Sequence, residues 1–410
     1  MKLFFTIVST TFVFYASAQR CGTADYQNSH PANPFTIQRN SILTTDSRDT
    51  LPNEVIIIPI VVHILYNTNE QNISDAQVLS QINSLNKDYR RLNADARNTP
   101  DPFKSVAADT RIQFCLAKVD PNGKYTTGII HKFTKDSLFY PDDAMKFSSE
   151  GGDNAWDATK YLNLWICNLS GKTLGYTVLP GSPLEKDGVV IKYNAFGTIG
   201  TVIAPYNKGR TATHEIGHWL GLKHLWGDGN CGDDGIADTP PQETNNINCP
   251  SFPHTSSCSI NSYGDMFMNY MDFTDDACMN MFTEGQKAEM RSLFALGHVR
   301  NSFLNSTVCD SSNAEGGPVP KDSTDSRLNV ITYPNPFNTQ INIVTKDSLV
   351  IGKTLKLYNI NGQLCLTQKI TSQKTSLNVN SLPSGMYILK IQSKDGESVY
   401  KLIKQGSSTY

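Results

Sequence analysis

Three apolar runs in the first half of the chain predict buried strands. Residues 55–66 (VIIIPIVVHILY) are almost entirely apolar, and residues 161–167 and 188–193 are shorter runs of the same kind. β-Branched side chains favour strands, and short apolar runs without strict alternation are typical of strands in the interior of a sheet. These runs therefore predict the sheet of a mixed α/β (α+β) domain.

Two segments carry the signals of amphipathic helices. Ser74 and Gln77 have the spacing of a capping box, and apolar side chains follow at intervals of three or four residues: Val78, Ile82, Leu85, Tyr89 and Leu92. Thr283 and Gln286 form a second such pair, and the helix expected after it carries Met290, Leu293 and Phe294. The first helix is long enough to back the predicted sheet.

The pattern changes again near the end of the chain. Residues 310–327 (DSSNAEGGPVPKDSTDSR) are polar and contain Pro and Gly, as in linkers. Residues 328–410 alternate apolar and polar positions between turn signals such as Asn361-Gly362. We therefore expect a domain at 53–309 that is large enough to be catalytic, a linker at 310–327, and a small all-β sandwich at 328–410.

The first residues predict export. Residues 1–18 combine one Lys, an apolar run and an Ala-Ser-Ala end, which is typical of a secretory signal peptide, and residues 19–52 are polar, like a pro-segment. No later run is long enough to predict a transmembrane segment. The net charge is −2 and the pI is about 6.4, so the chain has no basic field for nucleic acid or anionic lipid.

Export to an oxidising compartment allows disulfides. The nine cysteines are an odd number, so at least one is unpaired. Four of them, Cys231, Cys249, Cys258 and Cys278, lie in a long segment that is poor in apolar residues. The sequence alone allows three pairings among these four.

The segment 214–224 (HEIGHWLGLKH) carries the strongest chemical signal. His214 and His218 are four residues apart and therefore share one helix face. Glu215 is displaced from that pair, and Gly221 allows the helix to stop so that His224 can turn back as a third ligand. The alternative is a surface helix with incidental histidines.

Three neutral imidazoles and an open position are typical of a catalytic zinc, whereas structural zinc sites close all four positions. Such an ion acts as a Lewis acid and lowers the pKa of water towards 7. Glu215 would take the proton from the attacking water and deliver it to the leaving amine. This pattern predicts peptide-bond hydrolysis; the alternative for Glu215 is a solvated helix carboxylate.

The motif resembles the long zinc-binding consensus of the metzincin peptidases. Within that clan, GRTATHEIGHWLGLKHLWGDG, DDGIADTPPQ and DMFMNYMDFTDDACMNMFTEGQ resemble the pappalysin family, over most of residues 55–299. The resemblance implies a twisted mixed sheet, a zinc helix, and a methionine turn at Met271, which could otherwise be an ordinary core residue. Phe273 departs from the family, which commonly has Tyr there, and this departure could lower the rate.

The same resemblance implies further site residues. Asp276 would lie at the floor of the pocket that follows the scissile bond and select Arg or Lys; otherwise it is a loop carboxylate facing water. Asp234 and Thr239 would be calcium ligands in an oxygen-rich segment; otherwise this is a plain acidic loop. The disulfides implied are Cys231–Cys258 and Cys249–Cys278.

Cys21 is implied to be a latency switch. A thiolate is a good zinc ligand, and Cys21 could occupy the fourth position and exclude water. The alternative is an ordinary disulfide partner. The sequence does not assign the remaining four cysteines, Cys115, Cys167, Cys309 and Cys365.

The C-terminal module also resembles a known family. Its YPNPF start at 333–337, LYNINGQ, LPSGMYILKI and final KLIK resemble the sorting domain recognised by type IX secretion machinery. A generic carbohydrate- or protein-binding sandwich is the alternative. Together with the signal peptide, the resemblance implies passage to the periplasm and then release or attachment outside the cell.

These observations predict a secreted zinc endopeptidase that is made as a latent zymogen and cleaves protein or peptide substrates before Arg or Lys. One rival hypothesis is a surface binding protein that has kept a metzincin fold but lost activity, which only Phe273 supports. Another is a metzincin branch with a different side-chain preference.

Overall fold

The computed structural model describes residues 20–30, 54–258, 263–315, 330–333, 337–345, 351–359, 362–393 and 396–404. The predicted signal peptide and residues 19 and 31–52 of the predicted pro-segment lie outside the described residues. The chain divides into two compact units, Met1–Gly317 and Pro318–Tyr410. This boundary falls within the segment that the sequence predicts to be a linker.

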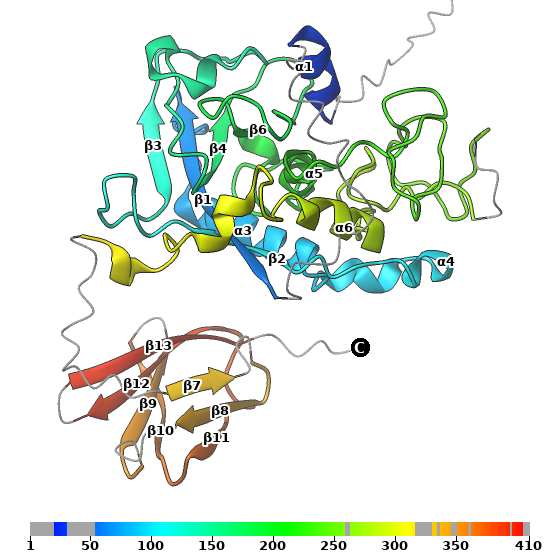
Figure 1. Cartoon of the computed structure of the whole chain (residues 1–410). Helices are drawn as coiled ribbons and strands as arrows, with labels where there is room; N and C mark the ends of the chain where they lie inside the picture. Colours follow the sequence, from blue (N-terminus) through cyan, green and yellow to red (C-terminus); the bar gives the residue numbers. More distant parts are fainter. Residues whose placement is uncertain are drawn as a thin grey trace, which may run out of the picture. The chain divides into compact units, whose positions relative to one another are not determined.

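The first unit contains a mixed sheet and, in its described residues, five α-helices: one precedes the first strand, two follow that strand, and two follow the last strand (Figure 1). The strands are β1 (Ile56–Tyr66), β2 (Ile112–Leu116), β3 (Ile129–Phe133), β4 (Leu162–Cys167), β5 (Gly175–Thr177) and β6 (Gly188–Lys192). The α-helices are α1 (Thr23–Ser29), α3 (Asp75–Tyr89), α4 (Asp101–Lys104), α5 (Arg210–Trp219) and α6 (Glu284–Ser292). The polar segment that contains α1 gave no helical signal in the sequence.

The sheet is mixed, as predicted. Its strand order is β2-β1-β4-β6-β5, and β3 pairs with the second half of β1. All neighbouring pairs are parallel except β5 with β6, which are antiparallel. The short antiparallel strand β5 forms one edge, so its outer backbone groups are available to another chain segment.

The two faces of the sheet pack against two different apolar clusters. On β4, Leu164 and Ile166 belong to the large core that also contains residues of α3 and α5. The alternate residues Trp165 and Cys167 belong to a second cluster on the other face, which includes Tyr26 and Tyr176. The period of two along a strand produces this division. The sheet is therefore buried on both faces, which explains the apolar runs in the sequence.

The predicted helix after Ser74 exists, with two differences from the sequence interpretation. Ser74 accepts a hydrogen bond from the Gln77 backbone, but the Gln77 side chain donates to the Phe196 carbonyl (2.8 Å) instead of closing the capping box. The prediction for Leu92 was wrong: the helix ends at Tyr89, Arg91 has a positive φ of 50°, and Leu92 is 70% exposed. The left-handed residue ends the helical spacing before Leu92.

The part below the zinc-motif helix is irregular. No helix or strand occurs between Trp219 and Glu284 in the described residues. Helix α6 then begins with a complete capping box formed by Thr283 and Gln286, as predicted. The disulfides Cys231–Cys258 and Cys249–Cys278 cross-link this segment, which has few regular backbone hydrogen bonds.

The second unit is all-β, as the alternating pattern predicts. Its strands are β7 (Val330–Tyr333), β8 (Gln340–Thr345), β9 (Thr354–Asn359), β10 (Leu364–Lys369), β11 (Lys374–Asn378), β12 (Gly385–Ser393) and β13 (Gly396–Lys404). They form two sheets with strand orders β10-β9-β12-β13 and β11-β8-β7. One apolar cluster joins the two sheets and contains Ile341, Leu377, Leu357 and Leu389, which makes the unit a sandwich.

Candidate metal centre

Three histidines converge at the end of α5. The Nε2 atom of His218 lies 3.1 Å from Nε2 of His214 and 3.0 Å from Nε2 of His224. Ligand nitrogens of a tetrahedral zinc are about 3.3 Å apart, given Zn–N bonds of about 2.0 Å. These three nitrogens and the sulfur of Cys21 all lie within 4.8 Å of one another. Among the described residues, no other group of three or more His, Cys, Asp or Glu ligand atoms lies this close together. The residues present therefore fit a zinc ion.

The hydrogen bond made by Nδ1 fixes the tautomer of the His214 and His218 rings. Nδ1 of His214 lies 2.7 Å from the Tyr270 carbonyl, and Nδ1 of His218 lies 2.7 Å from the Leu222 carbonyl. A carbonyl can only accept, so both Nδ1 atoms donate and both Nε2 atoms keep a free lone pair. Burial lowers the pKa of both rings, to about 3 for His218, and keeps them neutral as metal ligands must be.

The third ring is oriented by a carboxylate. Nδ1 of His224 contacts the carboxylate of Asp228, and the ring stacks on Trp226 at 4.4 Å. Helix α5 ends at Trp219 with Leu220 as its C-cap, and His224 reaches the cluster because Gly221 adopts a φ of +90° and turns the chain. The turn predicted at this glycine is present.

Met271 lies directly beneath the helix that carries the histidines. Asp272 N donates to the Asn269 carbonyl (3.1 Å), so residues 269–272 form a tight turn. A Cβ added at Gly217 would lie 2.5 Å from the Met271 sulfur. Gly217 is therefore the residue that allows the methionine to pack against α5 between the first two histidines.

Phe273 lies two residues after Met271, at the position where the family that the motif resembles commonly has Tyr. Its ring lies edge-on to His224 (4.8 Å) and Trp226 (5.0 Å), and also contacts His214 (5.6 Å). The side chain thus supports the orientation of the rings but offers no hydroxyl to the site.

Glu215 is fully buried beside the histidines. One carboxylate oxygen, Oε2, accepts a hydrogen bond from the Thr23 hydroxyl (2.8 Å), and Oε1 receives no N–H or O–H hydrogen bond within the described residues. Burial raises the pKa of Glu215 to about 7, although Thr23, Cys21 and Arg20 act in the opposite direction. A carboxyl group with a pKa near neutrality can both take and return a proton.

The N-terminal segment crosses this site beside the edge strand. Cys21 pairs in parallel with Gly175 of β5, and Gly22 N donates to the Gly175 carbonyl (2.8 Å). A Cβ on Gly175 would lie 2.9 Å from the Glu215 side chain, so only glycine allows β5 to approach so closely. Cys21 is 2% exposed, and burial and the charge of Glu215 raise the pKa of its thiol.

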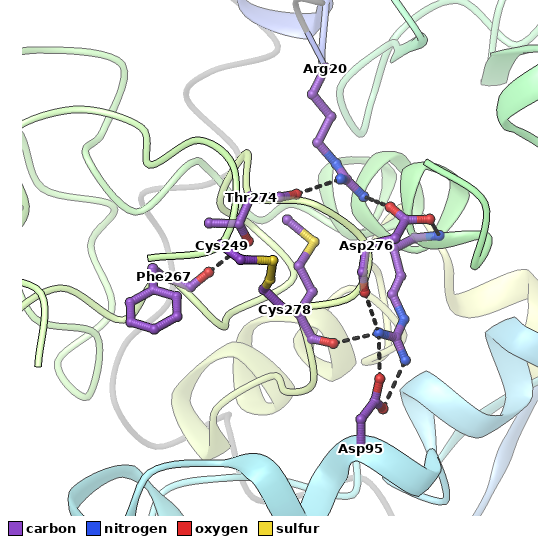
Figure 2. The surroundings of a disulfide bond; sticks show 9 residues. Arg20, Asp95, Cys249, Phe267, Thr274, Asp276 and Cys278 are labelled. Atoms are coloured by element: carbon purple, nitrogen blue, oxygen red, sulfur yellow. Dashed lines mark hydrogen bonds and ion pairs between the residues drawn. A yellow bond between two sulfur atoms is a disulfide. The ribbon is translucent and has the colours of Figure 1, made fainter. Parts of the chain in front are cut away.

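Arg20 points towards Asp276 (Figure 2). Its guanidinium donates to Asp276 Oδ1 (2.8 Å) and to the Thr274 carbonyl (2.7 Å), and lies over the ring of Tyr206. Arg20 is 1% exposed and Asp276 is 0% exposed, so this is a buried ion pair. Neither Arg20 nor Thr23 was predicted as a site residue, because their position beside Cys21 was the only signal available in the sequence.

Asp276 is held rigidly by the backbone around it. Its second oxygen, Oδ2, accepts from the backbone N–H groups of Lys208 (2.7 Å) and Arg210 (3.2 Å). The disulfide between Cys249 and Cys278 joins the chain two residues after Asp276 to the facing loop (Figure 2). The carboxylate does not face water, in contrast to the alternative interpretation from sequence.

The predicted calcium ligands lie together. The Thr239 hydroxyl lies 2.9 Å from each carboxylate oxygen of Asp234, and both residues are buried. Burial raises the pKa of Asp234 to about 6. Within the described residues, no group of three His, Cys, Asp or Glu ligand atoms forms around Asp234. An ion there would therefore need backbone carbonyls or water as further ligands.

The structure contains three disulfides. Two are the pairs implied by the family resemblance, Cys231–Cys258 and Cys249–Cys278. The third, Cys115–Cys309, joins β2 to the end of the first unit and was not assigned from the sequence. Cys21, Cys167 and Cys365 are free.

The fold and this site define the protein as a metzincin-type metalloprotease. The family model described as pregnancy-associated plasma protein-A matches residues 147–295, and a secretion system C-terminal sorting domain matches residues 331–405. An extracellular metalloprotease of Pyricularia oryzae is 33% identical over 54% of this chain and 68% of its own length. One from Arthroderma otae is 32% identical over 59% and 80%.

Two solved metalloprotease structures are also similar to this chain. Mature mirolysin of Tannerella forsythia in complex with a cleaved peptide is 52% identical, with a TM-score of 0.60, over 62% of this chain and 96% of that one. Promirolysin of the same organism is 47% identical, with a TM-score of 0.65, over 70% and 97%. The chain belongs to the pappalysin family of metzincin metalloproteases and carries a type IX secretion sorting domain.

The family implies a catalytic zinc ion, peptide substrates and secretion. No helix in the described part of the chain has the length and hydropathy required of a membrane span. The similarity to promirolysin supports a protease that is made as a zymogen.

Proposed function

We propose that this protein is a secreted zinc endopeptidase that is held latent by its own N-terminal segment and cleaves before Arg or Lys. The zinc ligands would be His214, His218 and His224, and Glu215 would be the catalytic base. The convergence of three Nε2 lone pairs beside a buried carboxylate is the observation that carries this proposal.

Zinc held by three imidazoles supplies Lewis-acid chemistry that polarises a peptide carbonyl and activates water at neutral pH. Glu215 takes the proton of the attacking water and returns it to the leaving amine. Its Oε1 atom lacks an N–H or O–H partner among the described residues and can accept this proton without breaking such a bond. The carbonyl acceptors behind the rings hold the metal-facing nitrogens unprotonated.

Asp276 would select the residue that follows the scissile bond. Its Oδ1 atom is the only one of its two oxygens not bonded to backbone N–H groups, and it accepts from a guanidinium in the structure. A buried carboxylate without its cation is costly, so an Arg or Lys side chain of a substrate would be favoured strongly over a neutral one. Arg20 serves as a model of such a side chain.

Latency would depend on three contacts of one short segment. Arg20 pairs with Asp276, and the Thr23 hydroxyl donates to Glu215. The Cys21 sulfur lies within 4.8 Å of the three histidine ligand atoms and would fill the fourth position of a zinc ion held by them. A zinc ion favours the thiolate form of Cys21 and would reverse the effect of burial on that group. The segment therefore blocks the metal, the base and the pocket together.

The N-terminal segment would cross the site in the direction opposite to that of a substrate. In a substrate cut before Arg, the residue at the metal precedes the Arg, whereas Cys21 follows Arg20. The segment runs parallel to β5, so a substrate that uses the same pocket would run antiparallel to it. A reversed chain does not present its carbonyl to Glu215 as a substrate does, which explains how it can occupy the site without being cut.

We further propose the processing order that the sequence predicts. Residues 1–18 would be removed as a signal peptide, residues 19–52 as a pro-segment, and residues 328–410 would direct export across the outer membrane, with release or surface attachment. The unit at 53–309 would carry catalysis, with residues 310–327 as linker. Asp234 and Thr239 would hold a structural calcium ion in the loop after His224.

Chelation provides the direct test of the zinc dependence. After removal of the N-terminal segment, the protein is expected to degrade casein in a zymogram, to lose this activity with a zinc chelator, and to regain it when zinc is added. Mass spectrometry of the fragments is expected to show Arg or Lys after most cut bonds. Proteolysis that persists without zinc would contradict the proposal, and absent proteolysis would favour the binding-protein hypothesis.

Substitution of Cys21 tests the latency mechanism. The full chain with Cys21→Ala is expected to cleave an Arg-containing fluorogenic peptide about tenfold or more faster than the unprocessed wild-type chain, because the fourth position opens. Cys365→Ser removes a free exposed cysteine of the second unit and serves as the control. Equal rates for the wild-type and Cys21→Ala chains would show that Cys21 does not restrain activity.

A further inference from the structure

A second buried contact of the N-terminal segment lies away from the metal, at Tyr26. This residue of α1 is 6% exposed and stacks on Tyr176 of β5, with ring centroids 5.0 Å apart. The Tyr26 hydroxyl donates a hydrogen bond to Asp143, and the Tyr176 hydroxyl donates to the other oxygen of that carboxylate (3.1 Å). The contact combines an aromatic surface with a specific acceptor.

The floor of this pocket is built from buried charges. Asp143 and Lys146 form an ion pair at 2.9 Å, with side chains 1% and 0% exposed. Lys186 adds a second cation 3.1 Å from the carboxylate. The Lys146 ammonium lies between 5.2 and 5.8 Å from the rings of Tyr26, Trp165 and Tyr176. We name the site formed by Asp143, Lys146, Trp165 and Tyr176 the Tyr26 pocket.

The Tyr26 pocket adjoins the edge strand β5, along which a substrate of the proposed protease would run. Helix α1 packs against the edge strand β5, and Thr177 N donates to the Thr23 hydroxyl (3.0 Å) as the segment leaves the metal. Because a substrate would run in the opposite direction, its residues before the scissile bond would lie on this side of the metal. Removal of the N-terminal segment withdraws Tyr26 and leaves the rings and the carboxylate available.

We propose that the Tyr26 pocket is a specificity subsite of the processed enzyme, which binds a tyrosine of the substrate a few residues before the scissile bond. The chemistry of the pocket excludes the other classes. An anionic side chain would meet Asp143, and a cationic one would meet Lys146 and Lys186. A phenylalanine fits the rings but leaves the carboxylate without the donor that Tyr26 supplies. A neutral aromatic side chain with a hydroxyl both stacks on the rings and donates a hydrogen bond to Asp143.

This inference rests on the proposed protease function, and its test separates the two. The processed protein is given peptides that differ at one position before the cut, which holds Tyr, Phe or O-methyltyrosine, with Arg fixed after the cut. At one such position, kcat/KM is expected to be about tenfold higher for Tyr than for the other two, as for a hydrogen bond to a charged acceptor. O-Methyltyrosine keeps the ring and its oxygen but has no O–H group to donate a hydrogen bond.

A variant assigns the effect to the pocket. Asp143→Asn keeps the shape of the side chain but removes its charge, and is expected to reduce the preference for Tyr over Phe to about twofold. Asp157→Asn, whose carboxylate is half-exposed and pairs with Lys160, serves as the control and should keep the full preference. Because the peptide series on the unchanged protein needs no variant, the proposal stays testable even when Asp143→Asn fails to fold.

The outcomes are distinct. Equal cleavage of all three peptides at every scanned position would overturn the subsite and leave the protease function intact. An undiminished preference in Asp143→Asn would overturn the role of Asp143. No cleavage of any Arg-containing peptide would instead contradict the proposed function itself.

Discussion

Replacement of Glu215 by Ala is expected to abolish proteolysis while zinc binding is retained. The histidine ligand atoms do not depend on this carboxylate, because their Nδ1 atoms are held by the Tyr270 and Leu222 carbonyls and by Asp228. Without the base, water must lose its proton unaided, and the rate should fall about 10²- to 10⁴-fold. The processed variant should contain one zinc per chain by metal analysis and cut no casein.

The matched control is Glu284→Ala, which removes an exposed glutamate from the first turn of α6. Both chains must have the N-terminal segment removed by an added protease, because a base-deficient zymogen could not process itself. Activity within tenfold of wild type in Glu215→Ala would refute the assigned base. Loss of zinc together with activity would show that Glu215 holds the metal site rather than serving the reaction.

The second large effect is expected from Asp276→Asn. The Lys208 and Arg210 N–H groups require an acceptor, so the new amide must turn its oxygen towards them and its NH₂ group towards the pocket. That NH₂ group cannot accept from a guanidinium and would repel it. We expect kcat/KM for peptides with Arg after the cut to fall about 10²- to 10³-fold, as for loss of one partner of a buried charge pair.

The neighbouring variant Asp275→Asn is the control, since its carboxylate is only partly buried and should change the rate by less than about threefold. Peptides with Gln in place of Arg should be cut by Asp276→Asn at least as fast as by wild type, because the amide leaves no buried charge without its cation. Thermal unfolding of both variants checks that the backbone around residue 276 is kept. An unchanged preference for Arg in Asp276→Asn would remove this residue from the specificity pocket.

The parts of the protein that depend on local pattern were predictable. The strands β1, β4 and β6 and helices α3 and α6 were located to within a few residues, because apolar runs and capping pairs act over short distances along the chain. The close approach of His214 and His218 follows from helical geometry alone. The break after Leu220 follows from one glycine. Leu92 was placed wrongly because a left-handed residue interrupts the spacing there.

Some features became predictable only through the family resemblance. The pairings Cys231–Cys258 and Cys249–Cys278 are present, but the sequence alone left three alternatives. Cys115 and Cys309 were left unassigned, and no local pattern joins two cysteines that are 194 residues apart.

The sequence by itself determined that this chain holds a zinc-type histidine motif on a helix, a mixed sheet and a separate all-β module. Only the tertiary structure decided which distant groups meet. Arg20 and Asp276 are 256 residues apart, Thr23 and Glu215 are 192 apart, and Tyr26 and Asp143 are 117 apart. Nothing in the local pattern encodes such pairs, because they form only when the whole core brings the N-terminal segment against the edge of the sheet.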